Sequence, residues 1–128
     1  MAVSVKELMR AAHERLRQGE PVALTTVVAT RGSTPQKAGA RMLIFADGKM
    51  LGTIGGGCIE AEVWSEAKRL LRRRQSALRE FTLADDPDEP GGDVCGGTMD
   101  VFIDVLQPAS QEQAPAQTGP RALAAAGA

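Results

Sequence analysis

The stretch Gly52-Thr-Ile-Gly-Gly-Gly-Cys-Ile-Glu-Ala-Glu62 decides the fold, because in it a short apolar strand runs through three glycines and a cysteine into a helix. Consecutive glycines let the backbone take φ values closed to other residues and leave N–H groups open to an approaching ligand. They also allow a helix to pack closely on a sheet, which is the alternative reading. We expect the functional site at this stretch.

The residues before this stretch predict a helix, a strand, a loop and a hairpin. Ser4 and Glu7 fit a capping box, apolar residues follow at helical spacing, and Gly19 can end that helix. Residues 22–30 are nearly continuously apolar and rich in β-branched side chains, which favours a central strand buried on both faces. After a loop over residues 31–40, two apolar runs flank Asp47-Gly48, a strong hairpin signal.

The residues after this stretch predict one long helix and two strands. Apolar side chains between 59 and 71 recur with a helical period, and residues 77–83 can form a strand. Residues 99–105 alternate apolar and polar side chains, as a half-buried strand does. Residues 85–93 are an acidic loop rich in Pro and Gly, and the composition of residues 107–128 predicts a flexible tail.

Length and composition bound the class of protein. A chain of 128 residues suits one domain, which we place at residues 1–106 ahead of the tail. We expect an α/β (α+β) fold with a mixed, mostly antiparallel sheet of about five strands and two main helices packed on it. A net charge of -1 argues against nucleic-acid binding. No segment resembles a secretory signal or a membrane span, so we expect a cytoplasmic protein with reduced cysteines.

Three loops are expected to meet at one end of the sheet. If neighbouring strands pair antiparallel, the loop over residues 31–40 emerges beside Gly55-Gly-Gly-Cys58 and beside the start of the last strand at Cys95-Gly-Gly97. A cysteine in the first turn of a helix is favoured as a thiolate, which is a soft metal ligand and a sulfur nucleophile. The free N–H groups of the same turn form an anion seat.

The loop can add charge and hydrogen-bond donors to this seat. The side chains of this kind are Arg31, Ser33, Thr34, Lys37 and Arg41. The set suits an anionic ligand that carries sulfur or a soft metal. Cys95 is either a small buried residue or a redox partner of Cys58. Glu60 and Glu62 are read as acids of the first helical turns, with Glu60 suited to capping, and no catalytic residue is predicted.

Five motifs in order resemble the amino-terminal domain of the XdhC/CoxI family, over roughly residues 8–106. They are Thr30-Arg-Gly-Ser-Thr-Pro35, Gly39-Ala-Arg-Met42, Asp47-Gly48, Gly52-Thr-Ile-Gly-Gly-Gly-Cys-Ile-Glu-Ala61 and Cys95-Gly-Gly97. The resemblance implies a chaperone that binds molybdenum cofactor (molybdopterin), assists its sulfuration with a cysteine desulfurase, and passes it to an apo molybdenum hydroxylase. Such a client would be a xanthine dehydrogenase or a CO-dehydrogenase-like enzyme.

By the same resemblance, Cys58 is the residue that contacts the cofactor and its metal, with Gly55, Gly56 and Gly57 beside it and Cys95 as a further candidate. Many relatives carry a second, Rossmann-like domain, so we expect self-association or a separate subunit to complete this one. Two other functions stay open. One is a thiol-based sulfurtransferase that carries a persulfide on Cys58, and the other is a non-catalytic interaction subunit whose glycines are structural.

Overall fold

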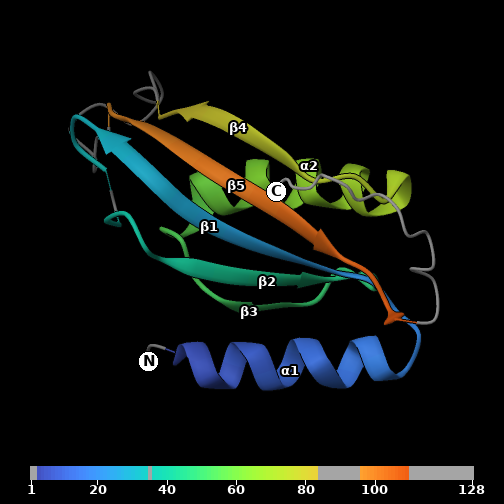
Figure 1. The fold of residues 1–128 in the computed structure, drawn as a ribbon. Helices are drawn as coiled ribbons and strands as arrows, with labels where there is room; N and C mark the ends of the chain where they lie inside the picture. The colour runs from blue at the N-terminus through green and yellow to red at the C-terminus, as the bar shows by residue number, and fades with distance from the viewer. Residues whose placement is uncertain (1–2, 35, 84–95, 110–128) are drawn as a thin grey trace, which may run out of the picture.

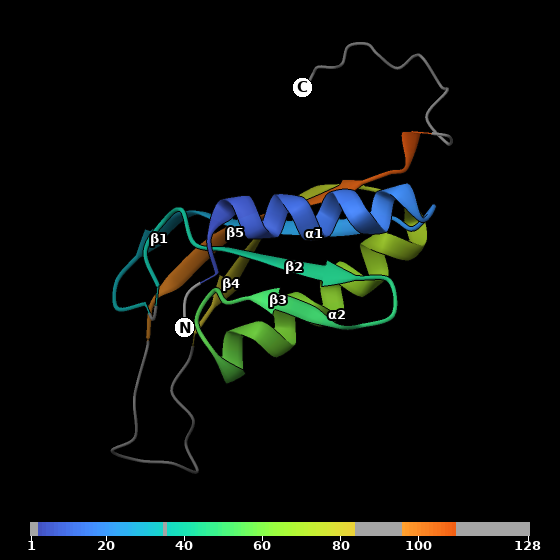
Figure 2. The same cartoon turned by 90° about the horizontal axis from the view of Figure 1, so that it is seen from below.

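The fold is built on one sheet with a helix on each side of it (Figures 1 and 2). The computed structural model describes residues 3–34, 36–83 and 96–109. Its elements are α1 (Val5–Arg17), β1 (Val22–Arg31), β2 (Arg41–Phe45), β3 (Met50–Gly52), α2 (Gly57–Arg73), β4 (Ala77–Thr82) and β5 (Thr98–Leu106). The strands lie in the order β3-β2-β1-β5-β4, and every pairing among them is antiparallel. The expected class, strand number and helix number are confirmed.

Each helix buries its apolar stripe against a different face of the sheet. Leu8 and Ala12 of α1 pack with Val22 and Leu43 in a smaller cluster on one face. The main core lies on the other face, where α2 covers four of the five strands. Its buried members include Ala23, Val27, Met42, Ile44, Ile59, Val63, Ala67, Leu70, Phe81, Met99, Val101 and Ile103. The alternation predicted for residues 99–105 is confirmed, since Met99, Val101 and Ile103 all point to the α2 side.

The predicted helix cap and the predicted hairpin turn both form. The Ser4 hydroxyl accepts a hydrogen bond from the Glu7 amide at 3.1 Å, and the Glu7 carboxylate accepts one from the Ser4 amide at 3.0 Å, which completes the capping box of α1. Gly48 has a φ of 92° in the turn between β2 and β3. The Trp64 indole donates a hydrogen bond to the Gly48 carbonyl at 2.9 Å, so the hairpin is fastened to α2.

The prediction that β1 is buried on both faces is correct for its first half only. Buried residues continue to Val27, but Val28 is 47% exposed, Ala29 and Thr30 are half-buried and Arg31 is exposed. The pairing with β5 shifts register between Val27 and Ala29, and the buried residues that α1 packs against all come from β1 and β2, with Leu51 and Leu106 at the margin of the cluster. Among the described residues, neither helix packs on the far half of that face. The acidic loop and most of the tail lie outside the described residues.

Candidate functional site

One end of the sheet gathers the loops that the sequence singles out. β1 and β3 end there and β5 begins there, since Arg31 pairs with Thr98 and β3 runs in the same direction as β1 (Figure 1). The loop after β1 packs against Gly97 so closely that a Cβ atom on that glycine would lie 2.6 Å from the Arg31 carbonyl oxygen. A side chain at position 97 is therefore excluded. The expected meeting of the residue 31–34 loop with Gly96-Gly97 is confirmed.

The glycine loop enters α2 through backbone conformations that need glycine. Gly55 has a φ of 145°, and Gly56, the residue that caps α2, has a φ of 90°. Gly57 is the first residue of the helix and Cys58 the second. A Cβ atom on Gly56 or on Gly57 would meet no atom within 4 Å, so neither glycine is required for close packing. At Gly57 neither packing nor φ demands a glycine, which leaves a bare, exposed backbone at the helix start.

Glu60 occupies part of the expected anion seat. Its carboxylate accepts hydrogen bonds from the Gly56 amide at 3.0 Å, from the Ile54 amide at 3.3 Å and from the Thr53 hydroxyl. Burial acts to raise the pKa of Glu60, but these hydrogen bonds outweigh it and bring the pKa below its usual value. Glu60 is thus the capping residue of this loop. The amides of Ile54 and Gly56 already have an acceptor, whereas the first amides of a helix have no intrahelical partner.

Arg31 is committed to the sheet. Its guanidinium donates to the Asp100 carboxylate at 3.0 and 3.1 Å and to Glu80 at 2.8 Å, across β1, β5 and β4. The hydrogen bond from Arg31 holds the pKa of Asp100 below its usual value. Ser33 is exposed, and the Thr34 hydroxyl donates to the Gln36 carbonyl at 3.0 Å. Arg31, Ser33 and Thr34 lie at the predicted end of the sheet, but the charge of Arg31 is already balanced by Asp100 and Glu80.

Arg41 is the predicted cation that remains available. It lines a cavity of about 210 Å³ between the start of α1, the end of the residue 36–41 loop and the end of β3. The other lining residues are Val3, Val5, Leu8, Gln36, Gly39, Ala40, Gly52 and Thr53. Within the described part of the chain, no hydrogen bond or ion pair engages the Arg41 guanidinium. Lys37 lies exposed on the same loop.

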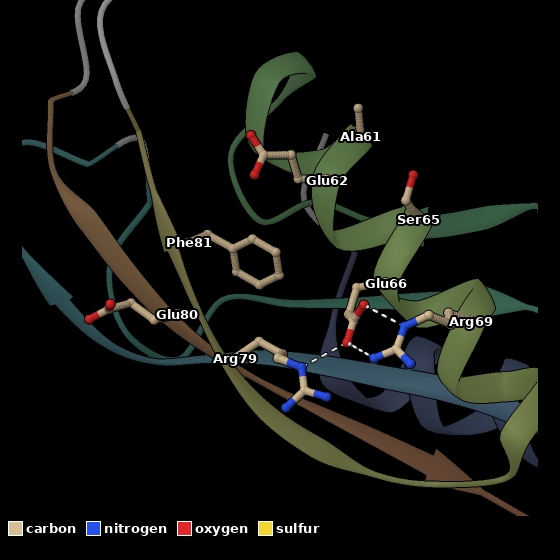
Figure 3. A pocket seen from close by; sticks show the side chains of 8 residues that line it. All are labelled: Ala61, Glu62, Ser65, Glu66, Arg69, Arg79, Glu80 and Phe81. Carbon is tan, nitrogen blue, oxygen red and sulfur yellow. Dashed lines mark hydrogen bonds and ion pairs between the residues drawn. The ribbon is translucent and has the colours of Figure 1, made fainter.

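A larger groove lies between α2 and β4, and sequence reasoning missed it. Its volume is about 740 Å³, and its walls are Ala61, Glu62, Ser65, Glu66, Arg69, Arg79, Glu80 and Phe81 (Figure 3). Glu66 bridges Arg69, at 2.7 and 3.0 Å, and Arg79, at 2.7 Å. These hydrogen bonds, that from Arg69 first, lower the pKa of Glu66 to about 2. The polar stripe at three- and four-residue spacing along α2 was the available signal.

The structure places one of the two cysteines. Cys58 lies in the first turn of α2, as predicted, while Cys95 lies outside the described residues. Among the residues that the structure describes, no group of three or more His, Cys, Asp and Glu side chains could hold a metal ion. No described helix has the length and apolar character needed to cross a membrane.

Fold and site together define a small α/β domain in which a glycine loop leads into the helix that carries Cys58. The cavity beside Arg41 is lined in part by residues just before this loop, and the groove between α2 and β4 is lined in part by residues just after it. Residues 15–82 match the model of the XdhC and CoxI family, and the chain belongs to that family. The resemblance drawn from the motifs is confirmed.

The proteins that are similar to this chain are much longer than the chain itself. An uncharacterized protein of Escherichia coli K12, YqeB, is 42% identical over 88 residues, which are 69% of this chain and 16% of YqeB. The molybdenum cofactor insertion chaperone PaoD of the same organism is 29% identical over 107 residues, 81% of this chain and 32% of PaoD. The chain therefore spans less than a third of the length of these relatives.

A solved structure shares the fold. The crystal structure of a xanthine dehydrogenase from Bacillus halodurans superimposes with a TM-score of 0.59 and 27% sequence identity, covering 72% of this chain and 28% of that one.

Proposed function

We propose that this domain binds molybdenum cofactor and takes part in its insertion into a molybdenum hydroxylase. Family membership supports this role, as do the names of two similar proteins, a molybdenum cofactor insertion chaperone and a xanthine dehydrogenase. The observation that carries the proposal is the bare backbone at Gly57, directly before Cys58 at the start of α2. Neither packing nor backbone strain requires that glycine, but close approach of a ligand does.

The chemistry of the site fits this cargo. A metal that arrives in its own dithiolene ligand needs at most one ligand from the protein, and Cys58 can supply it. A thiolate is a soft ligand that suits molybdenum and sulfur chemistry, and the start of a helix favours the thiolate form. In this proposal Cys58 contacts the metal or its sulfur, and the Gly57 amide faces an anionic group.

We assign the binding of the anionic group to the cations Arg41 and Lys37. The Arg41 side chain lines a cavity next to Thr53, and its charge has no partner in the described structure. Arg31 keeps the end of β1 fixed to β5 and β4, and Ser33 and Thr34 shape the loop that packs on Gly97. Gly55 and Gly56 set the path of the backbone into α2. Cys95 is proposed to approach the same end of the sheet.

The proposal also covers the sulfuration of the cofactor and its transfer to an enzyme. The domain holds the cofactor while a cysteine desulfurase supplies its terminal sulfido ligand, and then transfers it to an apo enzyme such as a xanthine dehydrogenase or a CO-dehydrogenase-like hydroxylase. It acts without turnover of its own, in the cytoplasm. Residues 1–106 form the working unit, and self-association provides the rest of the binding surface, since a core of this size leaves much of its surface exposed.

Anaerobic titration with molybdenum cofactor tests the assignment of Cys58. We expect saturable binding by the natural chain and by the control Glu14→Gln, an exposed position of α1, and at least a tenfold loss for Cys58→Ala. Titration of Cys95→Ala measures whether the second cysteine contributes. Circular dichroism of each variant confirms that the fold is intact. Equal, tight binding by the natural chain and Cys58→Ala would remove Cys58 from the role, and no binding by the natural chain would remove the function.

A sulfurtransferase is the second candidate, favoured by the position of Cys58 in the first turn of α2, where the thiolate form is stabilised. In this scheme a desulfurase transfers a sulfur atom to the Cys58 thiolate, which becomes a persulfide. The Cys95 thiolate then attacks the inner sulfur, so that a disulfide forms and hydrosulfide leaves. Mass spectrometry after incubation with a desulfurase and cysteine separates the two functions, because a chaperone without turnover gains no sulfur on either cysteine.

A further inference from the structure

We infer that the groove between α2 and β4 receives the aminopyrimidine ring of a pterin, with the Glu62 carboxylate as its hydrogen-bond acceptor. The inference rests on the proposed cofactor function and adds to it where the organic part of the cofactor lies. At about 740 Å³ the groove falls within the range of roughly 300–1,000 Å³ typical of small-molecule sites. It begins close to the cysteine, since Ala61 and Glu62 follow Cys58 by three and four positions on α2.

Of the three carboxylates that line the groove, only Glu62 is available to a ligand. Glu66 is held between Arg69 and Arg79, at 2.7 Å from a nitrogen of each. Glu80 is bound by Arg31 at 2.8 Å. Within the described residues, no hydrogen bond or ion pair engages the Glu62 side chain, which is exposed. An acceptor without a partner thus stands at the wall of a hollow large enough for a bicyclic ring.

The neighbours of Glu62 suit a flat heterocycle. The Phe81 ring projects from β4 toward α2 and forms an apolar wall, and Ala61 of α2 is a further apolar residue of the lining (Figure 3). Aromatic rings favour offset stacking with a partner ring. The Ser65 hydroxyl, one turn after Glu62 on the same wall, can donate to a ring carbonyl. The groove therefore combines an acceptor, an apolar surface and a donor.

A pterin presents the matching edge. Its ring N–H and its 2-amino group lie side by side, as two N–H groups of a guanidinium do, and a carboxylate accepts such a pair in parallel hydrogen bonds. An anion is the weaker choice of ligand for this groove, because three carboxylates line it against two guanidinium groups, and Glu66 stays ionised at neutral pH. The free charge that remains is the negative charge of Glu62.

Two matched ligands test this recognition directly. 6-Hydroxymethylpterin and 6-hydroxymethyllumazine differ in the 2-position, where the lumazine carries an oxo group in place of the amino group. We expect the natural chain to quench pterin fluorescence saturably and to bind the lumazine at least tenfold more weakly. Glu62→Gln should lose at least tenfold in pterin affinity, since its amide nitrogen opposes one of the ring donors. Glu14→Gln, an exposed residue of α1 away from the groove, should bind as the natural chain does.

The outcomes separate the groove from the cofactor function. Equal affinity for the two ligands, unchanged pterin binding by Glu62→Gln, or no fluorescence change up to the solubility limit of the pterin would each overturn the groove assignment. If the natural chain still binds whole molybdenum cofactor in the anaerobic titration, the proposed function survives that result. Failure of the whole cofactor to bind, with Glu62-dependent pterin binding retained, would instead overturn the cofactor function and keep the groove.

Discussion

The Glu60 carboxylate accepts a hydrogen bond at 3.0 Å from the amide of Gly56, the residue that caps the helix on which Glu60 itself lies. The same carboxylate reaches the Ile54 amide at 3.3 Å. The start of α2 is therefore closed by its own side chain, and the glycine loop keeps its shape without a ligand. Cys58 lies between the cap and the carboxylate in sequence.

Removal of this cap should destabilise the fold. We expect Glu60→Ala to lower the free energy of unfolding by about 1–2 kcal/mol, because two amides and a hydroxyl lose a charged acceptor. Glu62→Ala, two positions along and without a described partner, should stay within about 0.5 kcal/mol of the natural chain. Urea denaturation followed by circular dichroism measures both. Equal losses in the two variants would show that the cap contributes nothing.

Two glycines should respond in opposite ways to the same substitution. Gly57→Ala adds a methyl group into open space at a helix start, so stability should hold or rise by up to about 1 kcal/mol while cofactor affinity falls. Gly97→Ala places its methyl group 2.6 Å from the Arg31 carbonyl oxygen and should cost about 1–3 kcal/mol. Thermal melts and cofactor titration report the two effects. A stable Gly57→Ala variant with unchanged affinity would contradict the role given to the bare backbone.

The Glu66 bridge should make stability depend on acid. Its pKa lies at about 2 in the folded chain against 4.5 for the free side chain, so its contribution is complete above about pH 4.5 and is lost as the pH falls toward 2. We expect the unfolding free energy of the natural chain to fall more steeply across that window than that of Glu66→Gln. Glu14→Gln should follow the natural chain. Parallel curves for the natural chain and Glu66→Gln would refute the bridge.

The two arginines of the predicted site should separate binding from stability. Arg41→Gln should weaken cofactor binding about tenfold with little change in unfolding, because its charge has no partner in the described structure. Arg31→Gln should retain binding and lose only a little stability, because water screens the exposed ion pairs that it makes. Titration of both variants with molybdenum cofactor measures binding, and their unfolding in urea measures stability. A larger binding loss in Arg31→Gln would reverse the assignment.

Sequence alone predicted the features that depend on neighbours along the chain. The capping box of Ser4 and Glu7 and the Asp47-Gly48 reversal are local, and the alternation along β5 follows from a period of two. Glu60 was anticipated as a cap because its spacing from the glycines is also local. The strand order was not predicted, and β5 pairs with β1. The meeting of the loops followed from antiparallel direction, because it brings the ends of alternate strands to one end of the sheet.

Contacts between distant residues could not be predicted from spacing. The groove depends on how β4 lies beside α2, which brings Arg79 to Glu66 across thirteen positions of sequence. Arg31 resembled a ligand-binding cation until β4 and β5 placed Glu80 and Asp100 beside it. The open half of β1 depends on how far α1 reaches over the sheet, and the length of a helix does not reveal which strands it will cover.

The hydrogen bond from Trp64 to the Gly48 carbonyl gives the protein an optical reporter of its own. The chain has one tryptophan, and it lies on α2, the helix that also carries Cys58. Its emission reports whether the hairpin and α2 are in contact, and a pterin bound in the neighbouring groove would accept energy from it. Ligand arrival and helix detachment can therefore be followed in the unlabelled chain, one as energy transfer and the other as a change in emission wavelength.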